Sequence, residues 1–92
     1  MLLVKKLENM GDLSGQIMDF EFAGDILPMH SHDEITNHIT IVARGRIKVI
    51  NGDWVDEVVA GQIVDFKVGR PHEFIALEDN SRIINIVKKI AA

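Results

Sequence analysis

The sequence predicts an all-β domain built from antiparallel strands, arranged as a sandwich or a closed barrel. Short β-branched apolar segments recur at near-regular spacing, turn signals separate them, and no segment has the periodicity of an amphipathic helix. Several segments are apolar on both faces, for example Ile83, Ile84, Ile86 and Val87. One face of such a strand meets the core, and the other is covered by a second sheet or a second subunit.

The first expected strand covers residues 16–22, where Met18, Phe20 and Phe22 alternate with residues of the opposite face. This alternation has the period of a half-buried strand. The dipeptide Asn51-Gly52 is a strong signal for a hairpin between two strands. The other expected strands, divided by glycine, proline and polar turns, are residues 37–44, 46–50, 53–60, 62–68, 72–77 and 82–90.

Length and composition favour one domain over residues 1–92. The chain has 92 residues, of which 47% are hydrophobic, so it can bury a real core. Its net charge is −4 and its charges are mixed, which argues against nucleic acid as a partner. It has no cysteine, so disulfides and thiolate metal sites are excluded. The apolar start is too short for a signal sequence or membrane span, and we expect a cytoplasmic protein without a membrane partner.

The four histidines form a candidate metal site. His30 and His32 share parity, so on an extended segment both imidazoles point to one face and can bind one ion. His38 follows in the next expected strand, and His72 begins a later one. If these two strands are neighbours, four imidazoles converge inside the barrel. Such a site suits a divalent transition metal ion, namely iron, nickel, zinc, manganese or copper.

The segment around the first three histidines resembles the first motif of the cupins, a family of small jelly-roll β-barrels. That motif runs glycine, five residues, His-x-His, three or four residues, glutamate, six residues, glycine. Gly24, His30, His32 and Gly45 match it. His38 stands where the glutamate should be, and the gap before it is one residue longer than the usual maximum. The match is therefore altered at the one carboxylate ligand.

The second cupin motif resembles the segment around the fourth histidine. It runs glycine, five residues, proline, one residue, glycine, two residues, histidine, three residues, asparagine. Gly61, Gly69 and His72 match it, whereas Lys67 takes the place of the proline and Ala76 that of the asparagine. Fifteen residues separate the two motifs, a spacing that is similar to that of minimal single-barrel cupins.

The resemblance implies a cupin-type jelly-roll β-barrel, or double-stranded β-helix, with a metal ion on His30, His32, His38 and His72. Cupins include dioxygenases, isomerases, lyases and sugar-binding proteins. One hypothesis is therefore a metal-dependent dioxygenase or lyase/isomerase that acts on a small oxygenated metabolite such as a diketone, a keto acid or a sugar acid. The alternative is a non-catalytic cupin that binds a small ligand or sugar, or a purely structural barrel. No catalytic residue apart from the metal ligands is identified.

The last ligand of the site is open to two interpretations. His38 occupies the altered motif position, and Glu34 is the acidic alternative because it closely follows His32. Glu34 is expected in an exposed turn, which favours the histidine. Asp65 and Glu73 alternate away from the interior and are expected in solvent.

We also expect a homodimer. Strands that are apolar on both faces leave surface that water would otherwise meet in so small a chain. The expected contributors to the interface are Met1–Val4, Trp54 and residues 82–87. Trp54 can equally pack in the core.

Overall fold

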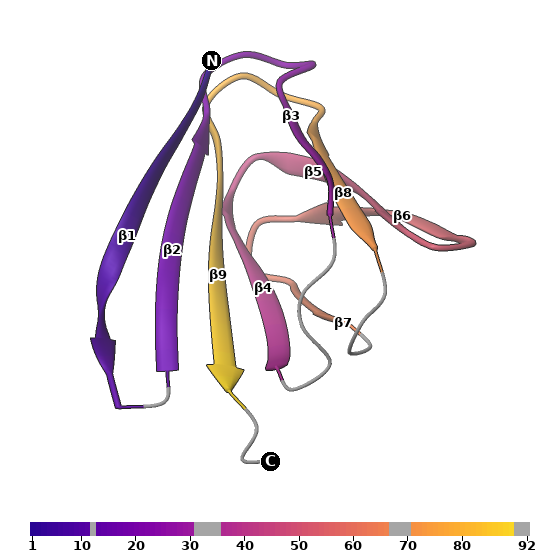
Figure 1. Cartoon of the computed structure of the whole chain (residues 1–92). Coiled ribbons are helices and arrows are strands. Elements are labelled where there is room, and N and C mark those ends of the chain that lie inside the picture. The colour runs from indigo at the N-terminus through magenta and orange to yellow at the C-terminus, as the bar shows by residue number, and fades with distance from the viewer. Residues whose placement is uncertain (12, 31–35, 67–70, 90–92) are drawn as a thin grey trace.

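The computed structural model describes residues 1–11, 13–30, 36–66 and 71–89, and these contain strands and no helix (Figure 1). None of the described residues therefore belongs to a helix that could cross a membrane. The strands are β1 (Leu2–Met10), β2 (Leu13–Phe20), β3 (Ile26–His30), β4 (Thr36–Arg44), β5 (Arg46–Asn51), β6 (Trp54–Val59), β7 (Ile63–Phe66), β8 (His72–Ala76) and β9 (Ser81–Lys89).

Two antiparallel sheets make up the fold. The larger sheet has the strand order β1-β2-β9-β4-β7, and the smaller has the order β3-β8-β5-β6. Strands distant in sequence are neighbours in both sheets, because β9 lies between β2 and β4 while β8 lies between β3 and β5 (Figure 1). The all-β, antiparallel jelly-roll prediction is confirmed.

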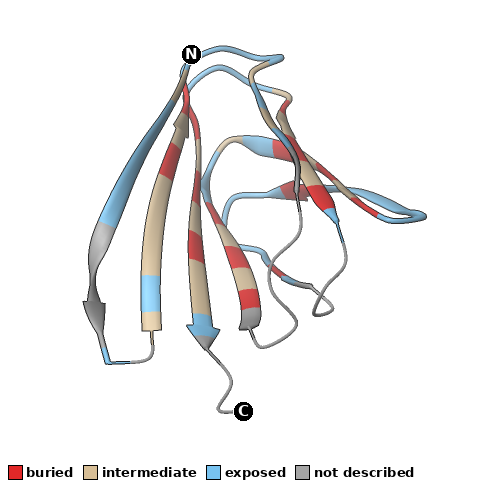
Figure 2. Cartoon of the chain, viewed as in Figure 1, coloured by how far each residue is buried: buried red, intermediate tan, exposed pale blue. Residues whose placement is uncertain are grey.

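The core lies between the two sheets and is built by alternation along the strands (Figure 2). In β5, for example, Ile47 and Val49 are completely buried whereas Arg46 is exposed. Burying one aliphatic or aromatic side chain of this size contributes about 1.5–3 kcal/mol, so the alternation fixes which face of each strand points inward. The buried apolar residues are Met18, Phe20, Val42, Ile47, Val49, Val58, Val64, Phe74, Ala76 and Ile83.

Gly45 allows the chain to pass from the larger sheet to the smaller one between β4 and β5. Its φ angle is +82°, and a Cβ atom there would lie 2.9 Å from the Cα atom of Ser81. Ser81 is fully buried, and its hydroxyl donates to the carbonyl oxygen of Glu78 at 2.8 Å. Any side chain at position 45 would therefore be strained and would also displace a bonded backbone segment.

Two strands were not expected from the sequence. β1 carries Lys5 and Lys6 beside its apolar residues, so it lacks a regular alternation, and it forms an edge of the larger sheet. β3 is a short strand that contains Pro28, which an edge position tolerates because proline cannot donate a backbone hydrogen bond.

One aromatic residue differs from the predicted placement. Phe22 was grouped with Met18 and Phe20, but β2 ends at Phe20 and Phe22 is 56% exposed beyond the strand end. Of the two placements expected for Trp54, the core is excluded, because Trp54 begins β6 at the edge of the smaller sheet and is 43% exposed.

The outer face of the larger sheet is apolar along one row. The register places Ile17 of β2 opposite Ile84 of β9, Ile84 opposite Ile41 of β4, and Ile41 opposite Ile63 of β7. The first three of these side chains are partly buried and Ile63 is 63% exposed. Strands that are apolar on both faces, as the sequence predicts, thus lie side by side in one sheet.

Candidate metal centre

Three of the predicted ligand positions lie at or near the ends of their strands. His30 is the last residue of β3, His72 is the first residue of β8, and His38 lies near the start of β4. These strand ends are the lower ends of β3, β8 and β4 as Figure 1 draws these strands. The antiparallel register of β3 and β8 makes His30 and His72 direct backbone partners. The topology therefore brings the two cupin-like motifs together, as the prediction requires.

The imidazoles of His38 and His72 face each other inside the barrel. His38 belongs to the larger sheet and His72 to the smaller one. Both are buried, with 3% and 1% of their surface exposed, and their ring centroids lie 5.0 Å apart at an angle of 51°. The ring of Phe74 lies 5.6 Å from that of His72 and forms an apolar wall beside it. Two imidazoles are thus held in a water-poor interior.

The orientation of His38 is set by hydrogen bonds within its own sheet. Its Nε2 atom lies 3.1 Å from the Oδ1 atom of Asn85 and 3.1 Å from the Oγ1 atom of Thr40. The hydroxyl of Thr40 donates its proton to the same Asn85 oxygen at 2.5 Å. Both neighbours of Nε2 consequently accept, so Nε2 carries the proton of the neutral ring. The Nδ1 atom then holds the lone pair with which His38 would bind a metal.

The amide of Asn85 is itself oriented. Its Nδ2 atom donates to the sulfur of Met18 at 3.4 Å, which leaves Oδ1 to accept from His38 and Thr40. Asn85 and Thr40 are backbone partners in the pair of β9 and β4, and both are buried. This arrangement resembles the hydrogen bonds by which carbonyl groups orient metal-binding histidines in general.

The separation of the two imidazole rings leaves room for a metal ion between them. Ring nitrogens bind transition metals at about 2.1 Å, which places each ring centroid about 3.2 Å from the ion. Two such rings at right or tetrahedral angles lie about 4.5–5.2 Å apart, and the distance between His38 and His72 is 5.0 Å. The two facing donor groups are both imidazoles, which suit divalent transition metals better than magnesium or calcium.

The side chains of the other predicted ligands lie outside the described part of the chain. His32 and the alternative Glu34 lie outside the described residues, and of His30 only the backbone is described. Among the described residues, no group of three or more histidine, aspartate or glutamate side chains is placed to hold a metal. The set of four ligands therefore stays a prediction, with two members adjacent in space.

Sequence reasoning missed the polar residues that surround these histidines. Asn85 lies between Ile84 and Ile86 in an apolar strand, and this isolated amide was the available signal. Asn51 was interpreted as part of a turn, but it is the last residue of β5 and only 8% exposed. Asn51 continues the alternation of buried residues in β5, and the turn begins only at the next residue. Its amide therefore faces the interior.

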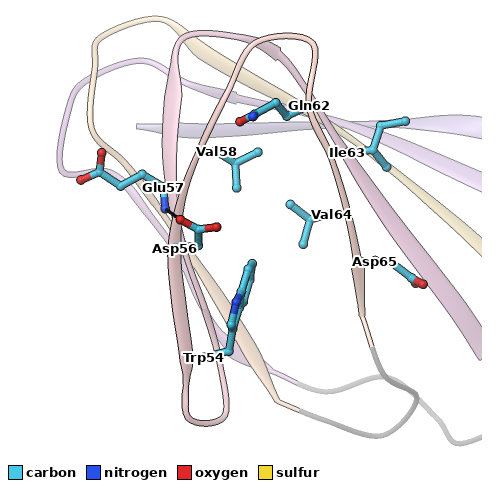
Figure 3. Close-up of a pocket in the computed structure, with 8 residues that line it drawn as sticks. All are labelled: Trp54, Asp56, Glu57, Val58, Gln62, Ile63, Val64 and Asp65. Carbon is cyan, nitrogen blue, oxygen red and sulfur yellow. Dashed lines mark hydrogen bonds between the residues drawn. The ribbon is translucent and has the colours of Figure 1, made fainter.

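A separate hollow of about 260 Å³ lies between β6 and β7, at the edges of the two sheets (Figure 3). The indole of Trp54 points into it, and carboxyl groups lie around it (Figure 3). Its lining residues are Trp54, Asp56, Glu57, Val58, Gln62, Ile63, Val64 and Asp65. Asp65 is exposed here, as the sequence predicts. The hollow therefore does not include the paired histidines.

Solved structures resemble this chain closely in fold. KdgF from Halomonas sp. has 21% sequence identity and a TM-score of 0.86, covering 98% of this chain and 80% of its own. An RmlC-like cupin protein from Desulfovibrio desulfuricans has 20% identity and a TM-score of 0.84, and the match covers 95% of this chain and 81% of that protein. The Cupin_2 domain of an XRE family transcriptional regulator from Enterobacter cloacae has 13% identity and a TM-score of 0.86, covering 98% of both chains.

Comparison of the sequence with known families and curated proteins identifies no relatives. No protein-family model matches it, and a search of curated proteins finds no match. At identities of 13–21%, the structural matches establish how the chain folds and leave its chemistry to the residues of the site.

Proposed function

Because the chain has the cupin fold, we propose that it is a small metal-binding cupin that acts on a small oxygenated metabolite. The observation that carries the proposal is the pair of buried imidazoles, His38 and His72, 5.0 Å apart on facing sheets. His30 supports it, because it is the backbone partner of His72. The proposed ligands are His30, His32, His38 and His72.

Imidazole ligands determine what the site would attract. Four neutral ligands leave a divalent ion its full charge of +2, so the bound ion would act as a strong Lewis acid toward anionic oxygen groups. Asn85 and Thr40 would hold His38 in position, and Phe74 would keep water from the interior. Suitable substrates carry oxygen ligands, as in diketones, keto acids and sugar acids.

The interior offers little acid–base chemistry of its own. The buried polar residues among those described are His38, Thr40, Asn51, His72, Ser81 and Asn85, and none of them is a carboxylic acid. The chain also has no tyrosine. This composition favours a dioxygenase or a lyase/isomerase in which the metal supplies the chemistry.

A non-catalytic role is the second candidate. A cupin domain of the same size in the Enterobacter cloacae protein is part of a transcriptional regulator. The scarcity of acid–base groups in the interior suits a domain that only binds a ligand as well as it suits metal chemistry. Both candidate functions use the same metal or ligand site, and only the enzyme would convert the bound compound to a product.

Elemental analysis tests the shared part of the proposal. The purified protein should hold about one transition-metal ion per chain, and His72→Ala should remove most of it. His38→Ala should lower the metal content less, because its motif position is the altered one. Glu73→Gln is the matched control, since Glu73 adjoins His72 on β8 but alternates away from the interior. Equal metal content in all four proteins would refute the site.

Oxygen uptake separates the two candidates. The iron-loaded protein is mixed with diketones and keto acids, and consumption of oxygen with one of them would support a dioxygenase. Product analysis with sugar acids tests the lyase/isomerase class. Tight binding of one of these compounds without turnover would support the non-catalytic role.

We also propose a homodimer formed through the larger sheet. Its outer face presents the row of Ile17, Ile84, Ile41 and Ile63, which a second copy of the sheet can cover. Trp54 belongs to the other sheet, so we omit it from this interface.

A further inference from the structure

Asn51 is a buried amide beside the candidate metal centre. In β5 it follows the alternation of Ile47 and Val49, so its side chain faces the interior. The register makes it the partner of His72 on one side and of Trp54 on the other. Directly opposed residues on neighbouring strands lie about 5 Å apart, which places Asn51 next to His72 on the inner face of the smaller sheet.

The carbonyl oxygen of Asn51 has no structural use in the described part of the chain. Its Oδ1 atom is buried, and none of the described residues donates a hydrogen bond to it. The amide and hydroxyl groups of Asn85, Thr40 and Ser81, by contrast, are all hydrogen-bonded. Burying an acceptor without a donor is unfavourable, so a bound molecule that donates a hydrogen bond to Oδ1 would be stabilised there.

We propose that the Oδ1 atom of Asn51 binds the ligand of the site by accepting a hydrogen bond from it. This inference rests on the proposed function, because it requires a ligand beside His38 and His72. It narrows the ligand class to an acid that carries a hydroxyl group near its carboxylate. The carboxylate is the group for the metal, and the hydroxyl donates to Asn51.

The acceptor also selects against other candidates. A diketone or a simple keto acid would place a carbonyl oxygen, and an ether would place an ether oxygen, against the Asn51 oxygen. With the amide of Asn51 oriented as it is in the structure, neither can donate a proton to Oδ1, so the buried acceptor would stay unsatisfied, which weakens binding. Hydroxy acids, sugar acids among them, satisfy it.

The test compares two probes that differ in one donor. Cobalt(II)-loaded protein is titrated with 3-hydroxypropionate and with 3-methoxypropionate, and binding is followed by the visible absorption of the cobalt. The wild type should bind the hydroxy acid about tenfold more tightly. In Asn51→Leu, a change of similar volume, this ratio should fall close to one. In Asn51→Asp, which keeps an acceptor, the preference for the hydroxy acid should persist.

The ratio of affinities decides the proposal. An unchanged ratio in Asn51→Leu would overturn it, as would a loss of the preference in Asn51→Asp. A cobalt titration without either acid tests the proposed metal centre by itself. If the wild type binds no cobalt, both the metal centre and this inference are refuted.

A melting experiment gives a readout without any ligand. Removing a buried, unsatisfied acceptor should raise the melting temperature of Asn51→Leu by about 4–8 °C in a domain of this size. A decrease of the same size would show that Asn51 serves the fold, and would overturn the proposal. Ser81→Ala, which removes a buried hydroxyl that is hydrogen-bonded, is the control and should lower the melting temperature.

Discussion

The Nε2 atom of His38 on β4 lies 3.1 Å from the Oδ1 atom of Asn85 on β9. The bond joins neighbouring strands of one sheet and determines which nitrogen of the imidazole holds the proton. The Oδ1 atom of Asn85 carries no proton, and the hydroxyl proton of Thr40 is donated to that atom, so neither neighbour can donate to Nε2. These bonds leave the lone pair of His38 on Nδ1, the atom through which the proposed metal would be bound.

Asn85→Leu should release this constraint. Nitrogen-15 NMR should show His38 of the wild type protonated at Nε2, and the variant should show a mixture of tautomers. The hydroxyl of Thr40 also loses its acceptor, so the free energy of unfolding should fall by about 1–3 kcal/mol. Metal affinity should fall about 10–100-fold.

Asn85→Asp provides the control for that experiment, because a carboxylate still accepts from Nε2 of His38 and from Thr40. It should keep the tautomer of the wild type. A wild-type protein in which His38 is protonated at Nδ1 would contradict the assignment.

Removal of the metal should lower the melting temperature without unfolding the barrel. The described core between the sheets consists of apolar residues and needs no metal to pack. Circular dichroism should therefore remain that of a β protein after treatment with a chelator. When the free metal concentration is about a thousand times the dissociation constant, binding adds about 4 kcal/mol to the free energy of unfolding. The chelator should remove this contribution. In His72→Ala the chelator should have little effect. A wild type that melts identically with and without chelator would refute a resident metal.

The sequence predicted the fold well because the signals involved are local. Alternation identifies β2, β4, β5, β8 and β9, and the hairpin dipeptide before β6 is visible in the chain. β1 escaped prediction because its apolar and charged residues do not alternate, and its strand character depends on pairing with β2. Pairing of that kind is a tertiary effect that local patterns do not contain.

For the candidate site, the sequence predicted which residues could be ligands but not the residues that support them. The motifs indicate which histidines converge, and the register of His30 with His72 agrees with them. The support of His38 by Asn85 depends on strands β4 and β9 being neighbours, which comes from the crossover of the jelly roll. The interior position of Asn51 was hidden, because asparagine before glycine is also a turn signal.

Gly45→Ala should destabilise the chain far more than Gly24→Ala. Both glycines have positive φ angles, of +82° and +92°, so each variant has a backbone cost of about 1–2 kcal/mol. Only at Gly45 does the new Cβ atom meet Ser81, whereas no described atom lies within 4 Å of a Cβ atom at Gly24. Overpacking adds about 1–3 kcal/mol at Gly45. Denaturant titration measures both variants, and equal losses would contradict the close approach.

Acid stability should depend on the ion pair of Asp19 and Arg82. The guanidinium donates to both carboxylate oxygens, at 2.6 and 3.0 Å, and this hydrogen bonding lowers the pKa of Asp19 below its usual value of 3.8. A lowered folded-state pKa means that the stabilisation is fully present above the unfolded-state pKa, and is lost as pH falls through the folded-state pKa. Asp19→Asn should therefore lower the melting temperature at neutral pH by a few degrees and have little effect near pH 2.

Asp65→Asn is the matched control for this pH series. Asp65 is an exposed carboxyl, and the described residues offer it no ion pair. Its substitution breaks no ion pair of the described residues, so the melting temperature at neutral pH should stay close to that of the wild type. A constant difference between wild type and Asp19→Asn from neutral to strongly acidic pH would contradict the role of the ion pair.

Light scattering at micromolar concentration should give twice the chain mass of 10.3 kDa. A specific dimer buries about 1,200–2,000 Å² of surface, and the isoleucine row of the larger sheet offers a continuous apolar strip for it. Ile41→Thr with Ile84→Thr removes the centre of that strip while keeping β-branched residues, so the variant should remain folded and dissociate. Val55→Thr, an exposed change on the smaller sheet, should remain dimeric. A monomeric wild type would refute the dimer, and a double variant that stays dimeric would place the interface elsewhere.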